Sequence, residues 1–102
     1  MWTPIAAAAS IVPGDYAQAE VDGVIVAVFN VAGEFYAVED VCTHDGGGLA
    51  GGAVDGDQVI CPRHGARFCL KTGAALTPPA YEAVRTYATR IHEGMLEVQS
   101  AS

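Results

Sequence analysis

The hydrophobic pattern of the first half of the chain predicts a meander of short strands. Residues 16–21 form a candidate strand that ends at Asp22-Gly23, a dipeptide with a strong preference for hairpin turns. Residues 24–29 (VIVAVF) follow as an unbroken apolar run rich in β-branched residues, which suits the middle of a sheet. Residues 30–33 are expected to turn the chain, and residues 35–38 to bring it back as the next strand.

The second half continues with shorter segments. Residues 51–54 and 58–60 are expected to pair as a hairpin around a turn at Asp55-Gly56, and residues 67–70 to form a further strand. Pro78-Pro79 predicts a stiff, extended segment.

The last twenty-two residues indicate the closing strands. Their spaced apolar residues, from Tyr81 to Val98, are interrupted by a turn signal at Glu93-Gly94. The chain has no convincing amphipathic helix, no internal repeat and no linker to a second domain. The pattern therefore predicts one all-β domain.

Two segments carry residues from which a metal site could be built. They are Cys42-Thr43-His44 and, after sixteen intervening residues, Cys61-Pro62-Arg63-His64. Together they offer two thiols and two imidazoles. Zinc could take all four ligands tetrahedrally, whereas a two-iron two-sulfur cluster could take the thiolates on one iron and the imidazoles on the other. Zinc modules usually pair like ligands within a segment, and each segment here is mixed, which favours the cluster.

The residues around these segments resemble those of the Rieske ferredoxin family. The resemblance rests on Cys42-Thr43-His44-Asp45-Gly46-Gly47-Gly48-Leu49 and on residues 61–68 (CPRHGARF), and also on residues 71–73 (KTG) and 76–80 (LTPPA). It covers most of the chain. It implies one Rieske-type 2Fe-2S cluster per chain, with Cys42 and Cys61 on the inner iron and His44 and His64 on the outer iron.

The resemblance also implies a fold. We expect the Rieske iron–sulfur fold, an antiparallel β-sandwich-like base with an inserted cluster-binding subdomain. A single Rieske domain would span residues 1–102, with the base at 1–41 and 81–102 and the cluster-binding subdomain at 42–80. By the same resemblance, Pro78-Pro79 belongs to a third loop that packs against the cluster, with an ordinary linker as the alternative.

Comparison with high-potential Rieske proteins of the cytochrome bc type predicts a low reduction potential. Those proteins carry a disulfide between the two ligand loops, and the matching positions here are Gly47 and Arg63. They also carry a serine and a tyrosine that donate hydrogen bonds to the cluster sulfurs, and Ala66 and Phe68 stand in those places. Missing donors leave more electron density on the sulfurs, so we expect a potential of about −150 mV.

The charge of the chain bears on its partners. The net charge is −7, and nine acidic residues precede Cys61 with no Lys or Arg among them. This balance argues against nucleic acid and against anionic membranes as partners. The acidic half is either a solvated surface or a docking face for a basic redox partner.

The remaining features suggest a cytoplasmic protein without catalytic activity of its own. The start of the chain lacks the basic region of a signal peptide, and its apolar run is too short to span a membrane. Cys69 is expected to be a small buried apolar residue, and His92 to be solvated. A mononuclear oxygenase iron needs two histidines and a carboxylate. Only His92 remains if His44 and His64 bind the cluster, so the chain cannot by itself be a complete oxygenase.

These features together predict a function. We expect a monomeric one-electron carrier with a low-potential Rieske cluster, passing electrons from a flavin-dependent reductase to a terminal ring-hydroxylating oxygenase of aromatic hydrocarbon catabolism. The alternative is a small Rieske-like subunit of an assimilatory nitrite reductase. A third possibility is an interaction module stabilised by zinc.

Overall fold

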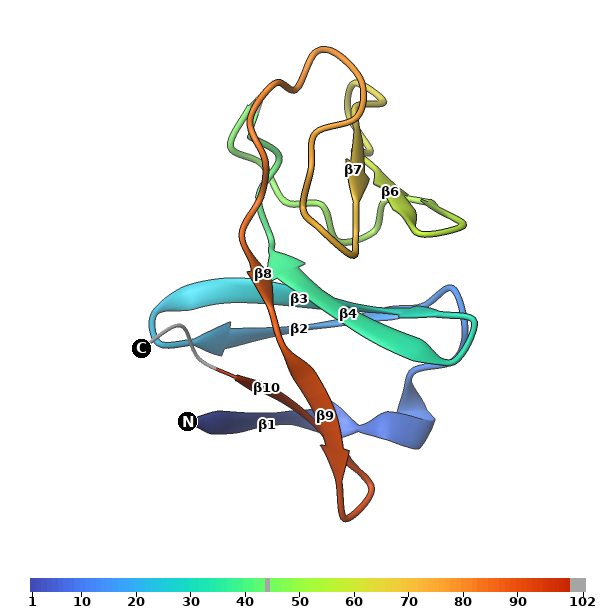
Figure 1. The fold of residues 1–102 in the computed structure, drawn as a ribbon, viewed down its shortest axis with the longest axis vertical. Helices are drawn as coiled ribbons and strands as arrows, with labels where there is room; N and C mark the ends of the chain where they lie inside the picture. The colour runs from blue at the N-terminus through green and yellow to red at the C-terminus, as the bar shows by residue number, and fades with distance from the viewer. Residues whose placement is uncertain (44, 100–102) are drawn as a thin grey trace.

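Three antiparallel sheets are stacked along the long axis of the molecule in the computed structural model, which describes residues 1–43 and 45–99 (Figure 1). The first sheet contains, in order, β1 (Trp2–Ala7), β10 (Met95–Gln99) and β9 (Thr89–His92). The second contains β2 (Tyr16–Val21), β3 (Val24–Val31), β4 (Glu34–Glu39) and β8 (Thr86–Tyr87). The third contains β5 (Val54–Asp55), β6 (Gln58–Ile60) and β7 (Arg67–Cys69). A short 3-10 turn, η1 (Ala8–Ser10), is the one helical element in the described part of the chain, so the all-β prediction is confirmed.

The first two sheets pack face to face and form the base. Their shared core consists of small and medium-sized apolar side chains: Ile11, Val21, Val26, Val28, Ala37, Leu96 and Val98. Each of these residues is at most 4% exposed. The base is therefore the antiparallel sandwich-like structure that the sequence predicts.

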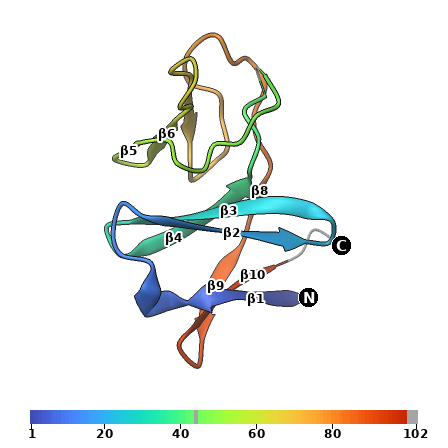
Figure 2. The same cartoon turned by 180° about the vertical axis from the view of Figure 1, so that it is seen from behind.

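Strand β3 faces two cores at once, which explains its unbroken apolar run. Because side chains alternate between the faces of a strand, Val26 and Val28 point into the base core, whereas Ala27 and Phe29 point to the opposite side. That opposite side is covered by the third sheet and its loops (Figure 2). A strand that is buried on both faces has no polar alternation.

The segment between β4 and β8 leaves the base and returns to it. It builds the third sheet and the long loops at the opposite end of the molecule from β1 (Figure 1). Its core joins side chains of the base to those of the insert: Ala27, Phe29, Val38, Cys42, Leu49, Val59, Cys61, Ala66, Phe68, Leu70, Ala80 and Val84. Both candidate ligand cysteines belong to this core, so the packing of the insert onto the base also fixes the positions of these two cysteines.

Three hairpins of the base use turns in which both central residues have positive φ. The central pairs are Asp22-Gly23, Ala32-Gly33 and Glu93-Gly94, with φ near 52° for the first residue and between 80° and 94° for the glycine. Such turns match the natural twist of paired strands. Two of these turns are predicted at the right residues. The third lies at the end of the expected 30–33 turn, because β3 continues to Val31.

Three sequence predictions need correction or addition. Strand β1 was not expected, and it forms by pairing with β10 from Trp2↔Gln99 to Ala7↔Met95. The β5–β6 turn is centred on residues 56 and 57 rather than 55 and 56, since Asp55 pairs with Gln58. The Pro78-Pro79 bond is cis and lies in a turn, so the expectation of an extended segment there is wrong.

The helical content also bears on membranes. In the described residues, no helix has the length and apolar character needed to cross a lipid bilayer.

Candidate metal centre

The two loops that begin at the candidate ligand cysteines are closed by the same pair of backbone hydrogen bonds. In the first, the N–H of Cys42 donates to the carbonyl of Gly47 at 2.6 Å, and the N–H of Gly46 donates to the carbonyl of Cys42 at 2.7 Å. In the second, the residues at the same offsets from Cys61 make the same two bonds, at 2.7 and 3.0 Å. The fourth residue after each cysteine is a glycine, with φ of 76° in one loop and 74° in the other. Glycine adopts this left-handed conformation without steric cost, so both loops can close tightly.

The loops bring the two cysteines together in the interior. Cys42 and Cys61 are each 1% exposed, and neither forms a disulfide. Their sulfur atoms and a carboxylate oxygen of Asp45 all lie within 4.8 Å of one another. Burial by itself raises the pKa of the Cys61 thiol, but backbone N–H groups of Arg63 and His64 and the side chain of Cys42 outweigh it and lower this pKa below its usual value. Since the thiolate is the form that binds metals, this environment favours metal binding.

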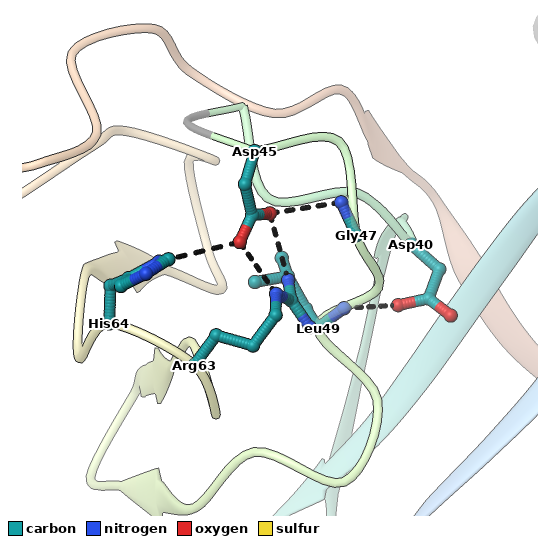
Figure 3. A network of polar contacts seen from close by, with 6 residues as sticks. All are labelled: Asp40, Asp45, Gly47, Leu49, Arg63 and His64. Carbon is teal, nitrogen blue, oxygen red and sulfur yellow. Dashed lines mark hydrogen bonds and ion pairs between the residues drawn. The ribbon is translucent and has the colours of Figure 1, made fainter.

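The candidate histidines fall into two cases. The side chain of His64 is 54% exposed, and its Nδ1 lies 3.5 Å from Oδ2 of Asp45 (Figure 3). His64 therefore lies on the solvent side of the two buried cysteines. His44 lies outside the described residues.

A bidentate ion pair connects the two loops. Asp45 comes from the first loop and Arg63 from the second, with Nε to Oδ2 at 2.6 Å and Nη2 to Oδ1 at 3.0 Å (Figure 3). Oδ1 of Asp45 also accepts the N–H of Gly47 at 2.9 Å. The guanidinium lies against Gly47 so closely that a Cβ there would be 2.5 Å from its central carbon. The carboxylate of Asp45 raises the pKa of Arg63, so this guanidinium is charged at any physiological pH.

A second carboxylate attaches the first loop to the base. Oδ1 of Asp40 accepts the N–H groups of Leu49 and Ala50, at 2.6 and 2.9 Å, and its Oδ2 accepts Nε2 of Gln18 at 2.5 Å. A Cβ at Gly48 would be 3.1 Å from this carboxylate, so the absence of a side chain there permits the close approach. Asp40 thus connects strand β2 to the end of the cysteine loop.

The segment after the two prolines is held against the same loop. Oγ1 of Thr43 donates to the carbonyl of Glu82 at 2.6 Å, and Ala80 is 3% exposed in the core that contains both cysteines. Tyr81, which lies between Ala80 and Glu82 in the sequence, is 82% exposed. The proline-containing loop therefore packs beside the site, as the resemblance implies, and presents an aromatic side chain to solvent.

The surroundings of the cysteines fit a cluster with few hydrogen-bond donors from side chains. Ala66 and Phe68 are both fully buried in the core with Cys42 and Cys61, and neither has a hydroxyl. The hydroxyl of Thr43 is engaged with a backbone carbonyl. Two buried thiols, an exposed imidazole and glycine-rich turns suit the donor set of a 2Fe-2S cluster that has one iron inside and one near the surface.

Cys69 and His92, the remaining cysteine and histidine of the sequence, lie apart from the candidate metal site. Cys69 is half-buried at the end of β7, where hydrogen bonding with the Thr72 side chain lowers the pKa of its thiol. The side chain of His92 is 57% exposed, and its nearest carboxylate, on Glu93, is 3.9 Å away. His92 is solvated, as expected.

Sequence reasoning missed the two aspartates of the site. Asp40 was counted only among the acidic residues that precede Cys61, and Asp45 only among those and within the stretch that resembles the Rieske ferredoxin family. One signal was available, because Asp45 and His64 both stand three positions after a cysteine and each is followed by glycine. That shared spacing indicates that Asp45 and His64 occupy equivalent places in two similar turns.

The sequence and structure of this chain are similar to those of known proteins. Residues 1–88 match the family described as Rieske [2Fe-2S] domain. The chain is 45% identical over 80 residues to the biphenyl dioxygenase ferredoxin subunit of Pseudomonas sp. (strain KKS102), covering 78% of this chain and 73% of that protein.

Two solved structures show the same fold. A chain in the complex of reduced oxygenase and oxidized ferredoxin in carbazole 1,9a-dioxygenase has a TM-score of 0.89 and 34% identity, over 95% of this chain and 91% of that one. A putative NADH-dependent nitrite reductase small subunit from Mycobacterium tuberculosis has a TM-score of 0.90 and 27% identity, over 100% of this chain and 96% of that one. Together with the two loops and their cysteines, these matches show that the chain belongs to the Rieske [2Fe-2S] domain family, whose cofactor is a 2Fe-2S cluster of the Rieske type.

Proposed function

We propose that this chain is the ferredoxin of a ring-hydroxylating dioxygenase system. In this role it takes one electron at a time from a flavin-dependent reductase and passes it to a terminal Rieske oxygenase. Cys42, Cys61, His44 and His64 hold the cluster, with the cysteines on the inner iron and the histidines on the outer one. The chain carries electrons and has no catalytic site of its own.

The observation that carries this proposal is the exposure of His64 above two buried cysteines. The cluster supplies a one-electron reduction and oxidation couple when it is bound. The residues of the chain determine where that electron can enter and leave. Cys42 and Cys61, at 1% exposure, face the interior, whereas the His64 side chain, at 54%, faces solvent, where a partner protein could dock. Imidazoles are neutral and thiolates are anionic, so the added electron resides on the imidazole side.

A cavity of about 360 Å³ lies in the base rather than at the two cysteine loops, lined by residues of β4, β9 and β10 and the turn before β4, such as Phe35, Arg90 and Leu96. A site that exchanges electrons with proteins needs an accessible surface rather than a pocket.

The dioxygenase role rests on the relatives and on charge. Biphenyl dioxygenase and carbazole 1,9a-dioxygenase both use ferredoxins that resemble this chain. Acidic residues without an ion pair among the described residues include Glu39, near the insert, and Glu82, beside Tyr81. These two carboxylates and the exposed ring of Tyr81 would suit contact with a basic partner. We further propose that the chain acts in the cytoplasm as a monomer, with residues 42–80 as its cluster-binding subdomain.

The second candidate function is that of a nitrite reductase small subunit, which the likeness to the M. tuberculosis protein favours. Such a subunit would remain bound to a large catalytic chain. A mobile carrier would instead form short-lived complexes with two different proteins, one after the other.

Reconstitution of electron transfer tests the proposal. The reductase and oxygenase of the biphenyl dioxygenase system are mixed with NADH, oxygen and biphenyl, and this chain replaces the native ferredoxin. We expect turnover that depends on this chain, and no turnover with the Cys61→Ala variant. Absence of electron transfer, together with stable copurification of this chain with a nitrite reductase large subunit, would favour the second function.

A further inference from the structure

We propose that Asp45 and Arg63 form a bridge between the two ligand loops that keeps the loops at cluster-binding distance and balances charge beside the cluster. Both are positioning residues. The inference rests on the ligand set proposed above, but it does not depend on the identity of the redox partners.

The contact has the geometry of a bridge rather than of a casual surface pair. Two parallel bonds, at 2.6 and 3.0 Å, join the guanidinium to both carboxylate oxygens. Paired bonds of this kind fix the orientation of both groups as well as their distance. The side chain of Asp45 is only 20% exposed, and a third bond from the N–H of Gly47 holds it in place. The first loop therefore holds the Asp45 carboxylate in a fixed orientation toward Arg63.

Gly47 shows that the bridge depends on close contact between the loops. A Cβ at this position would lie 2.5, 2.7 and 2.9 Å from three atoms of the Arg63 guanidinium. Any larger residue would push the guanidinium away from Asp45. The positions where the cytochrome bc type has a disulfide between its loops are thus occupied here by a glycine and by the arginine that packs on it.

The charge of Asp45 lies close to the cysteines. One of its carboxylate oxygens is within 4.8 Å of the sulfur atoms of Cys42 and Cys61. An unpaired carboxylate at that distance would oppose the binding of an anionic cluster and would make its reduction harder. Because Arg63 is paired with Asp45, the local charge is balanced. Loss of either residue should therefore weaken retention of the cluster. The reduction potential should fall when Arg63 is lost and rise when Asp45 is lost.

Four variants of the cluster-loaded protein test the bridge. Arg63→Met removes the positive charge, and Arg63→Lys keeps it without the paired geometry. Asp45→Asn removes the negative charge but retains an oxygen for the N–H of Gly47, and the fourth variant combines Asp45→Asn with Arg63→Met. Arg67→Met is the matched control, because Arg67 has a similar exposure (34% against 38%) and pairs with Asp55 away from the ligand loops.

Two measurements are made on each variant. The first is the rate at which the visible absorption of the cluster bleaches in the presence of an iron chelator. We expect at least a fivefold faster loss in Arg63→Met and in Asp45→Asn, an intermediate rate in Arg63→Lys, and a wild-type rate in Arg67→Met. The double variant should lose its cluster no faster than the faster single variant, since the bridge can be broken only once. The second is the midpoint potential, which should fall in Arg63→Met and rise in Asp45→Asn.

Each outcome decides the matter. Loss rates of both single variants within twofold of the Arg67→Met control overturn the bridge. So does a double variant whose loss rate is the product of the two separate effects. Potentials unchanged in both single variants overturn the charge balance. If Arg63→Met cannot be isolated with its cluster, Arg63→Lys and Asp45→Asn decide by the same criteria. A wild-type protein that fails to load a cluster would instead refute the proposed ligand set.

Discussion

Replacing Asp40 with alanine should detach the first ligand loop from the base and accelerate loss of the cluster. Asp40 ends the meander of the base, and its Oδ1 accepts two backbone N–H groups of the loop, from Leu49 at 2.6 Å and from Ala50 at 2.9 Å. Leu49 is fully buried in the core shared with Cys42 and Cys61. In Asp40→Ala, both N–H groups would lose their acceptor at a point that solvent reaches poorly.

The magnitude follows from these two bonds. A hydrogen bond to a charged group contributes roughly 1.5–3 kcal/mol, and the loss is smaller where water can replace the acceptor. For two bonds at a half-buried site we expect about 2–4 kcal/mol. Because each 1.4 kcal/mol is a factor of ten, the detached state of the loop should become roughly 30 to 700 times more populated. The bond from Gln18 adds little, since it is exposed.

The assay is the first-order bleaching of the visible cluster band in excess iron chelator. Asp40→Ala should bleach at least tenfold faster than the wild type, while Asp40→Asn, which keeps an oxygen for both N–H groups, should lie between the two. Asp15→Ala is the matched control, because Asp15 accepts the N–H of the adjacent Tyr16 within the base, at 2.8 Å. If Asp40→Ala bleached within twofold of Asp15→Ala, the loop would be held by other contacts and the reasoning would be refuted.

Three further predictions concern the potential and the docking of partners. Ala66→Ser and Phe68→Tyr should each raise the midpoint potential by roughly 60 mV if the added hydroxyl donates a hydrogen bond to a cluster sulfur. This shift is the one-electron equivalent of about 1.4 kcal/mol. An unchanged midpoint potential of the double variant in film voltammetry would contradict this prediction. Tyr81→Ala should slow reduction of the oxygenase by roughly 5- to 30-fold in stopped-flow measurements at unchanged potential, because an exposed aromatic side chain beside the site is a typical interface anchor. The same second-order rate should decrease as salt rises from low to physiological strength, and the decrease should be smaller in Glu39→Gln/Glu82→Gln; equal salt dependence in wild type and variant would argue against acidic docking.

Features set by local backbone preference were predictable from the sequence. The hairpins at Asp22-Gly23 and Glu93-Gly94 form where expected, because a tight turn with two positive φ values places its demand on the two residues themselves. The burial of Val26 to Phe29 in β3 was equally clear, because a long apolar run on an exposed strand would be an aggregation hazard.

Features set by distant partners were not predictable. Strand β1 contains Pro4 and two alanines, which are poor strand formers, and it is held in place by pairing with β10. Its first side chain, Trp2, also stacks on the guanidinium of Arg90, 4.5 Å from the ring centroid, across the same sheet. Neither contact leaves a signal in the sequence around β1.

The positions of the site residues become intelligible once the two loops are seen as equivalent. Counting from each cysteine, the second and third following positions carry His44 and Asp45 in one loop and Arg63 and His64 in the other. Each loop therefore gives one of these positions to a proposed imidazole ligand and the other to the ion pair. Because the imidazoles stand at different offsets, the acid and the base also stand at different offsets and can meet across the gap between the loops. The difference in spacing between the two segments is thus what allows the proposed bridge between the loops to form without a disulfide.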